Sequence, residues 1–165
     1  MVPLTAGTLV EHEHIKRLKY AYLRCIDQKR YDELRTLLLD DATASYGGGR
    51  HSYDGADAIV AFIANAMGDP GVHSSHHCHH PEIELSSASE AVGTWALEDT
   101  VIDTRFDVTI HGAAFYEDHY RKVEGRWLIA QTGYRRTYEE IFPRSSIEGL
   151  RMTGSWWATD GRSEL

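Results

Sequence analysis

Cysteine, positive charge and long apolar runs are all scarce in this 165-residue chain, and each scarcity excludes a class of protein. The two cysteines, Cys25 and Cys78, can form one bridge at most, and neither belongs to a CxxC pair, so we expect reduced thiols. The chain has 25 acidic against 17 basic residues, and its net charge of -8 repels phosphate backbones and anionic lipid surfaces. We therefore expect neither nucleic acid nor a membrane as a partner.

No apolar run reaches the roughly 18 residues of a membrane span. The first residues, MVPLTAGTLVEHEH, lack the charged and apolar regions of a signal peptide, which favours a cytoplasmic location. Apolar residues make up 42% of the chain, enough at this length for one buried core but hardly for two. We expect a single domain over residues 1–165.

Apolar residues recur at helical spacing in three segments of the first half. The first stripe runs from Ile15 to Ile26, and its helix should end near residues 27–29. A second short helix fits YDELRTLLLDD (31–41), and a third fits GADAIVAFIANAMGDPG (55–71), which ends in a Gly/Pro stop. Three helices are thus expected before the sheet.

From residue 73 onward the pattern changes to the alternation typical of strands. The long alternating segments are EAVGTWALEDTVID, VTIHGAAFYEDHYRKV and RWLIAQTGYRRTYEEIF. Glu124-Gly125 is a tight-turn signal between the last two. We expect an α+β fold in which an antiparallel sheet curves around the helices and leaves a cone-shaped pocket. The tail after Pro143, with Trp156 and Trp157, is apolar enough to cover a pocket or a neighbouring subunit.

Two strands place polar side chains on apolar faces. Asp99 is in phase with Trp95, so it should point inward, and inward carboxylates are frequent in catalytic sites. A strand-end acid satisfied by the backbone or a lysine explains the pattern equally well. Tyr134, Arg136 and Tyr138 share one strand face by alternation. An inward Arg136 would clamp an anionic or carbonyl group, and a surface strand with cation–π stacking is the alternative.

The segment HSSHHCHHPE (73–82) carries five histidines and one cysteine in its first eight positions. By alternation His76, Cys78 and His80 could share a face and bind a metal. Zinc, however, needs three or four converging ligands, and adjacent strand residues point to opposite faces. We therefore favour one catalytic base among bystanders, with no metal site.

Five segments in a fixed order resemble the bile-acid 7α-dehydratase group of the SnoaL-like family, within the nuclear-transport-factor-2-like superfamily. They are AYLRCIDQKRYDEL, TASYGGG, HSSHHCHHPEI, WALEDTVI and GAAFYEDHYRKVEGRWLIAQTGYRRTYEE. Scytalone dehydratase and hexachlorocyclohexane dehydrochlorinase are more distant relatives in the same superfamily. The resemblance covers residues 14–142 approximately. It implies a cone-shaped α+β barrel, a homotrimer and no metal or organic cofactor.

The resemblance also assigns roles to residues. It implies His76 as the catalytic base and Asp27 as the partner that orients it, although a solvated acid at a helix end explains Asp27 by itself. Tyr22 and Tyr46 would donate hydrogen bonds to a developing oxyanion. Asp99 would position substrate or act as a second acid or base. The expected substrate-binding residues are Tyr46, Arg136, Trp95, Tyr134 and Phe115, with Arg136 less securely matched because Arg135 is adjacent.

Which histidine faces inward is ambiguous by alternation. The family's second histidine matches His79, yet Ile83 is in phase with His77 and His79 rather than with His76. Pro81 could shift that register.

The expected function is a cofactor-independent lyase of the dehydratase type. It would take a proton α or vinylogous to a carbonyl in a hydrophobic alicyclic, steroid-like or polyketide-like small molecule. Histidine suits this task because its ordinary pKa of about 6.5 lies near working pH. An isomerase that uses the same base, or a non-catalytic ligand-binding module of the same fold, is the alternative.

Overall fold

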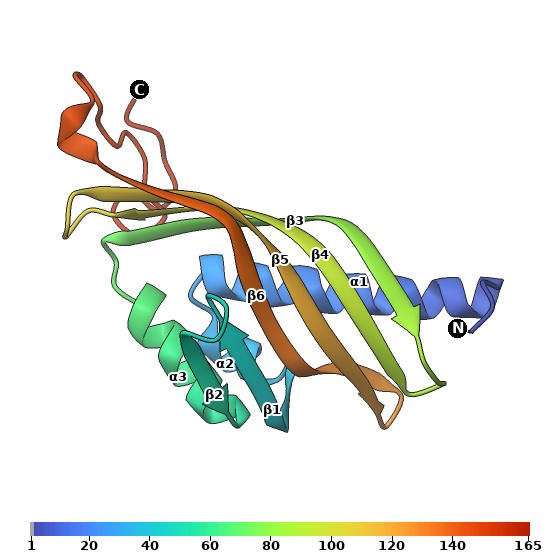
Figure 1. Cartoon of the computed structure of the whole chain (residues 1–165). Helices are drawn as coiled ribbons and strands as arrows, with labels where there is room; N and C mark the ends of the chain where they lie inside the picture. Colours follow the sequence, from blue (N-terminus) through green and yellow to red (C-terminus); the bar gives the residue numbers. More distant parts are fainter. Residues whose placement is uncertain (1) are drawn as a thin grey trace.

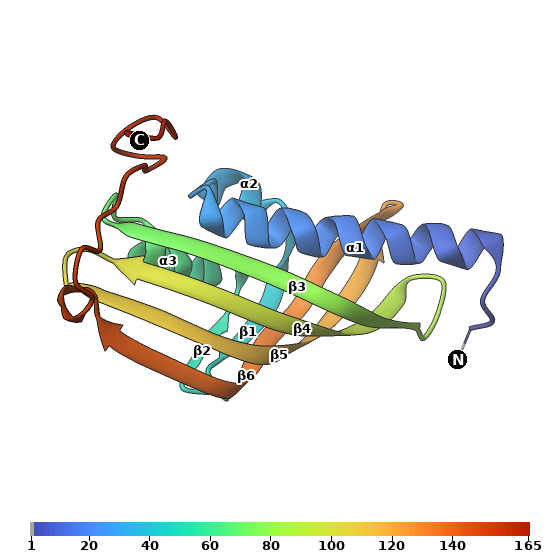
Figure 2. The same ribbon diagram turned by 90° about the horizontal axis from the view of Figure 1, so that it is seen from above.

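The computed structural model describes residues 2–165 and consists of helices packed against one curved sheet (Figure 1). Its elements are α1 (Ala6–Asp27), α2 (Tyr31–Arg35), β1 (Leu38–Tyr46), β2 (His51–Asp54), α3 (Ala56–Met67), β3 (Val72–Leu85), β4 (Glu90–Asp103), β5 (Val108–Val123), β6 (Arg126–Pro143) and a short 3-10 turn at Arg144–Ser146. Viewed from above, α1 runs alongside β3 (Figure 2). Among residues 2–165, no helix has both the length and the apolarity that crossing a bilayer requires.

Helix α1 begins at Ala6 and ends at Asp27, within the predicted end at residues 27–29. Thr5 caps its first turn, and the side chains of Thr5 and Thr8 satisfy each other's backbone N–H groups. Its buried stripe runs from Ile15 to Ile26 and faces the sheet, as helical spacing predicts. The helix ends at Asp27, so this carboxylate lies at the helix terminus next to β3.

The sheet is mixed and open. In residues 2–165 it has six strands in the order β2-β1-β6-β5-β4-β3. Neighbouring strands are antiparallel except β1 and β6, which are parallel. Glu124 and Gly125 both have positive φ, 51° and 80°, in the predicted tight turn between β5 and β6. The expected α+β fold, with helices against a curved sheet, is confirmed, although the sheet does not close into a barrel.

The prediction of three helices before any strand is wrong, because β1 and β2 precede α3. The second helix stops at Arg35. Leu34 and Leu37 fit a helical stripe, but the chain then turns into β1, where Ala42, Ala44 and Tyr46 are buried at alternate positions. This strand is held by its parallel pairing with β6, a partner far away in the sequence.

Strand β3 contains a one-residue bulge. His79 pairs with Ala96 and Glu82 with Thr94, so three residues of β3 advance against two of β4. His80 takes the left-handed conformation there, with φ of 47°. The bulge shifts the inward and outward positions of everything that follows.

The bulge resolves the ambiguity among the histidines. Before it, His76 and Cys78 face the helices, and His77 is exposed on the outer face. After it, Ile83 and Leu85 turn back toward the core. The apolar residues at the end of β3 are therefore compatible with an inward His76.

The C-terminal tail docks at the start of β3. Ser155 is buried and its hydroxyl lies 2.8 Å from Nε2 of His73. Trp157 packs with its ring centroid 5.0 Å from the ammonium of Lys29, whereas Trp156 is exposed.

Candidate active site

Asp27 and His76 form a close pair where α1 ends beside β3. Nδ1 of His76 lies 2.6 Å from Oδ1 of Asp27, and the backbone N–H of His76 donates to Oδ2 at 3.0 Å. The hydroxyl of Ser74 donates to Oδ1 at 2.8 Å. The imidazole is 8% exposed, so the helix end and the strand hold it largely out of water.

These contacts keep the Asp27 carboxyl ionised and determine which ring nitrogen of His76 carries a proton. Burial by itself raises the pKa of the Asp27 carboxyl, but its hydrogen bonds and charge interaction with His76, together with the bond from Ser74, hold that pKa below its ordinary value. An ionised carboxylate only accepts hydrogen bonds, so Nδ1 of His76 carries the proton. In the neutral imidazole of this tautomer, Nε2 carries the lone pair that can accept a proton from a substrate.

Two phenols lie close to this pair. The hydroxyl oxygens of Tyr22 and Tyr46 are 2.7 Å apart, and both side chains are buried. Burial raises the pKa of both phenols, so they remain protonated at neutral pH and keep O–H groups to donate. The ring of Tyr116 meets that of Tyr22 edge-on, with centroids 6.5 Å apart.

A cavity of about 90 Å³ connects the histidine to the phenols. Its lining is mostly aromatic and aliphatic and comes from α1, α3 and four strands: Tyr22, Ile26, Tyr46, Phe62, Ile63, Ala66, Met67, His76, Tyr116 and Tyr134. Asp27 and His76 also line a larger groove of about 370 Å³ between α1 and β3. His76 therefore lies between the apolar cavity and the groove.

Arg136 binds the carboxylate of Asp99. The two guanidinium nitrogens of Arg136 donate to the two carboxylate oxygens of Asp99, which is 3% exposed. Arg136 also contacts the carboxylate of Glu139 at 3.0 Å. Asp99 does point inward as predicted, but the arginine expected to clamp a substrate instead neutralises this buried acid.

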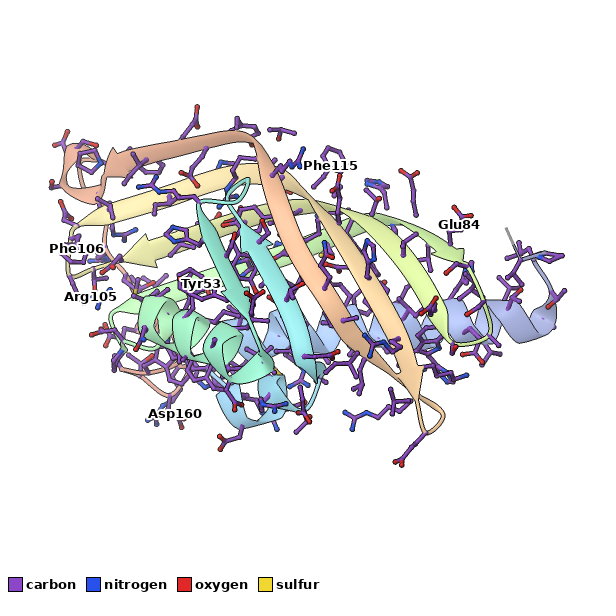
Figure 3. The ribbon with its side chains drawn as sticks, turned by 60° about the horizontal axis from the view of Figure 1, so that its bottom comes forward. Tyr53, Glu84, Arg105, Phe106, Phe115 and Asp160 are labelled. Atoms are coloured by element: carbon purple, nitrogen blue, oxygen red, sulfur yellow. The ribbon has the colours of Figure 1, made fainter. Side chains whose placement is uncertain are left out.

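Three further predicted positions lie outside the cavity. Trp95 is fully buried, but in the core, where its Nε1 donates to the hydroxyl of Tyr120 at 2.9 Å. Phe115 is 48% exposed on the outer face of the sheet (Figure 3). Tyr53, which was not predicted to be part of the site, packs beside α3. Tyr138 is exposed as well, because a register shift between β5 and β6 turns it away from the face of Arg136.

Sequence reasoning missed several residues that complete the site. Ser74 holds Asp27, and Tyr116 lines the cavity from β5. Tyr116 falls in phase with the inward residues of its strand, which is a signal that alternation could have supplied. The cavity-lining residues of α3, Phe62 among them, belong to a helix that was predicted without a role.

A buried ion pair lies behind these aromatic rings. The ammonium of Lys19 is 2.7 Å from Oδ2 of Asp118, and both side chains are fully buried. The same ammonium is 3.3 Å from the ring centroid of Tyr116 and 5.0 Å from that of Tyr22. Thr132 donates to the other oxygen of Asp118 at 2.7 Å. The charges of this pair are thus compensated within the core.

The geometry gives no support to a metal site built from His76, Cys78 and His80. The bulge removes His80 from the face that His76 and Cys78 share. Burial raises the pKa of the Cys78 thiol to about 11, which disfavours the thiolate that metals bind. Nowhere in residues 2–165 do three His, Cys, Asp or Glu side chains stand in an arrangement ready for a metal ion.

An open curved sheet with helices on its concave side is the cone-shaped α+β fold. The acid–base pair lies where helix and sheet meet. Residues 7–132 match the family described as the SnoaL-like domain, and the chain belongs to that family. Scytalone dehydratase arp1 from Aspergillus fumigatus is 28% identical over 137 residues, which are 74% of this chain and 81% of that protein.

Solved structures show the same architecture. A protein described as a scytalone dehydratase, from Novosphingobium aromaticivorans, is 25% identical with a TM-score of 0.77, over 83% of this chain and 91% of that one. Hexachlorocyclohexane dehydrochlorinase LinA-type3 from Novosphingobium barchaimii is 20% identical with a TM-score of 0.74, over 88% of this chain and 95% of that one. The second likeness supports the fold alone.

Proposed function

We propose that this protein is a lyase that removes a proton from a carbon next to a carbonyl, or vinylogous to one, and expels a leaving group from the neighbouring carbon. The observation that carries the proposal is the 2.6 Å contact between Asp27 and His76 at the edge of an apolar cavity. A histidine base that is oriented by a carboxylate and largely shielded from water is the arrangement that proton abstraction from carbon requires.

The reaction follows from the contacts. Nε2 of His76 accepts the substrate proton, and Asp27 stabilises the imidazolium that forms. Negative charge moves onto the carbonyl oxygen, where the hydrogen-bonded Tyr22–Tyr46 pair supplies a hydroxyl donor in a desolvated setting. The imidazolium then returns its proton to the departing group, so the base is regenerated without a co-reactant. Both carboxylate oxygens of Asp99 are bound by Arg136, so Asp99 is not a second acid in this reaction.

The relatives support a lyase over a passive binding module. The sequence relative and the solved structure at 25% identity are both described as scytalone dehydratases, and a dehydratase is an elimination enzyme. Loss of water, loss of halide and double-bond isomerisation share the first step, and we propose dehydration because the relative matched in sequence is a dehydratase. The closer kinship with bile-acid 7α-dehydratases stays a prediction.

The size of the cavity favours a compact substrate. An apolar cavity of about 150 Å³ is enough to hold benzene, and the cavity here, which is open at its mouth, is smaller at about 90 Å³. A one- or two-ring carbonyl compound that extends toward the mouth fits this space better than a steroid skeleton does. The aromatic lining suits a planar or half-planar ring.

Hydrogen–deuterium exchange tests the proton-abstraction step directly. A small cyclic β-hydroxy ketone in D₂O, followed by NMR, should exchange at the carbon next to the carbonyl and lose water with the native protein. His76→Ala should slow both processes by about 10² or more, the usual size of a general-base contribution. Asp27→Asn should cost less, because the ring keeps a partner but loses the stabilising charge.

The double variant provides the sharper comparison. Because the two residues act as a unit, His76→Ala with Asp27→Asn should be little slower than His76→Ala alone. His119→Ala, which changes an exposed histidine on the outer face, is the matched control and should leave the rate unchanged. Full activity in His76→Ala on a compound that the native protein turns over would refute the assignment. Exchange without loss of water would indicate an isomerase.

A further inference from the structure

The proposed reaction gives no role to the side of the cavity that α3 forms, and Phe62 is the largest α3 side chain there. We propose that Phe62 is the specificity-determining residue of this site. Its ring admits one substrate ring to the cavity and keeps a second ring at the mouth. The size limit is a property of binding, and its consequence for turnover rests on the proposed function.

Helical spacing directs Phe62 toward the cavity. Ile59 and Ile63 are the buried residues on the core side of α3. Phe62 and Ala66 are four positions apart and therefore share the neighbouring face of the helix. Both line the cavity, but Phe62 is partly buried whereas Ala66 is exposed. This face therefore runs from the interior of the cavity to its mouth.

Three other rings hold the phenyl group of Phe62 in place. Its centroid lies 4.5 Å from that of Tyr53 and 5.2 Å from that of His51, both on β2. Tyr46 of β1 stacks on it as well, with centroids 5.7 Å apart. Aromatic pairs at such separations attract each other. Rotation of Phe62 out of the cavity would break all three contacts, so its ring is a fixed wall.

The position of this wall limits what fits beside the phenols. Tyr46 stacks on Phe62, and its hydroxyl is 2.7 Å from that of Tyr22. A carbonyl oxygen bound to the phenol pair therefore brings its ring close to Phe62. The cavity volume is about 90 Å³, whereas a cavity of about 150 Å³ holds benzene. Because the phenyl ring has the size of benzene, its removal opens the space that one further ring needs.

The other α3 side chains are weaker candidates for this role. Met67 also lines the cavity, but an unbranched side chain with three rotatable bonds adapts to a ligand. Ile63 is only 5% exposed and packs in the core. The rigid ring of Phe62 is therefore the α3 group whose shape is imposed on the substrate.

Binding of phenol and 2-naphthol to the full chain tests the proposal without requiring turnover. The two probes differ by one fused ring, and each carries a hydroxyl that the phenol pair can bind. Calorimetric titration gives a Kd for each probe. Phe62→Ala should raise the affinity for 2-naphthol relative to phenol at least tenfold, since even one methylene group changes discrimination in an apolar pocket by about 10–200-fold. Phe62→Leu, which keeps part of the wall, should give an intermediate ratio.

Two control variants complete the test. Phe106→Ala removes a ring that is 72% exposed in the turn between β4 and β5, and it should keep the native ratio. Asp27→Asn should slow turnover but keep the native ratio as well, so failure of the proposed reaction is distinguishable from failure of the size limit. Circular dichroism spectra should show that every variant is folded. A native ratio in the folded Phe62 variants, or an equal rise in Phe106→Ala, would overturn the proposal.

Discussion

His76 and Asp99 pair across β3 and β4, and both side chains face the helices, yet each is bound to a different partner. His76 is bound to Asp27, at the end of α1, and Asp99 to Arg136 on β6. The arginine neutralises the acid next to the base, so Asp27 is left as the carboxylate that orients the imidazole. The two carboxylates are thus each held by a different partner on neighbouring strands and helix ends.

The Arg136 pair should matter for stability. Arg136→Gln leaves the buried Asp99 without its counter-charge, and breaking a buried pair in this way costs about 3–5 kcal/mol of the free energy of unfolding. Urea denaturation measures this loss. Adding Asp99→Asn should recover part of it, because the uncompensated charge is removed. Arg135→Gln, at the exposed neighbouring position, is the control. An Arg136→Gln variant as stable as the native chain would contradict the pairing.

The two buried phenols should matter for turnover more than for folding. Tyr22→Phe or Tyr46→Phe removes one hydroxyl of the 2.7 Å pair. Loss of one oxyanion donor lowers kcat by about 10²–10³, whereas loss of one hydrogen bond costs about 1 kcal/mol of stability. Tyr138→Phe, at an exposed position of β6, should change neither quantity. Native kcat in both buried variants would exclude the phenols from the reaction.

The depressed pKa of Asp27 predicts a pH dependence of stability. Its carboxyl binds a proton more readily in the unfolded chain than in the folded one, so its contribution is full above about pH 4, the ordinary aspartate pKa. The contribution is lost as pH falls through the lower folded pKa. Between about pH 5 and pH 2, the native chain should lose stability more steeply than Asp27→Asn. Parallel curves from urea denaturation would contradict this linkage.

We expect a trimer, from the family resemblance and from the apolar side chains on the outer face of the sheet. Phe115 is 48% exposed and Val92 38% exposed there. Light scattering at micromolar concentration should report three chains, and Phe115→Asp should shift the population toward monomer. Phe106→Asp, in the turn between β4 and β5, should leave assembly unchanged. A native chain that is monomeric would refute the trimer and leave the fold intact.

Sequence patterns over a few neighbouring residues correctly predicted the features that depend on those residues alone. The stripe from Ile15 to Ile26 gave α1 with its end at Asp27, and Glu124-Gly125 gave the tight turn before β6. Alternation alone placed Asp99 inside. These features depend on a few neighbouring residues, so the sequence around each is sufficient to predict them.

Features that depend on distant partners were not predictable in the same way. Strand β1 depends on parallel pairing with β6, and Leu34 and Leu37 fit a helix equally well. The Arg136–Asp99 contact joins residues 37 apart in the sequence, and no local pattern links them. Phe115 was misplaced because family membership indicates an aromatic pocket without indicating which face of β5 each ring occupies.

The bulge at His80 makes the spacing of β3 as important as its composition. If one residue were deleted there, either the histidines or Ile83 and Leu85 would have to turn to the other face of the sheet. Exposure of the two apolar residues costs about 1.5–3 kcal/mol for each fully buried side chain. Rotation of the upstream part would instead carry His77 and His79 into the cavity and expose His76. Segment length therefore decides which imidazole meets a substrate and which meets solvent.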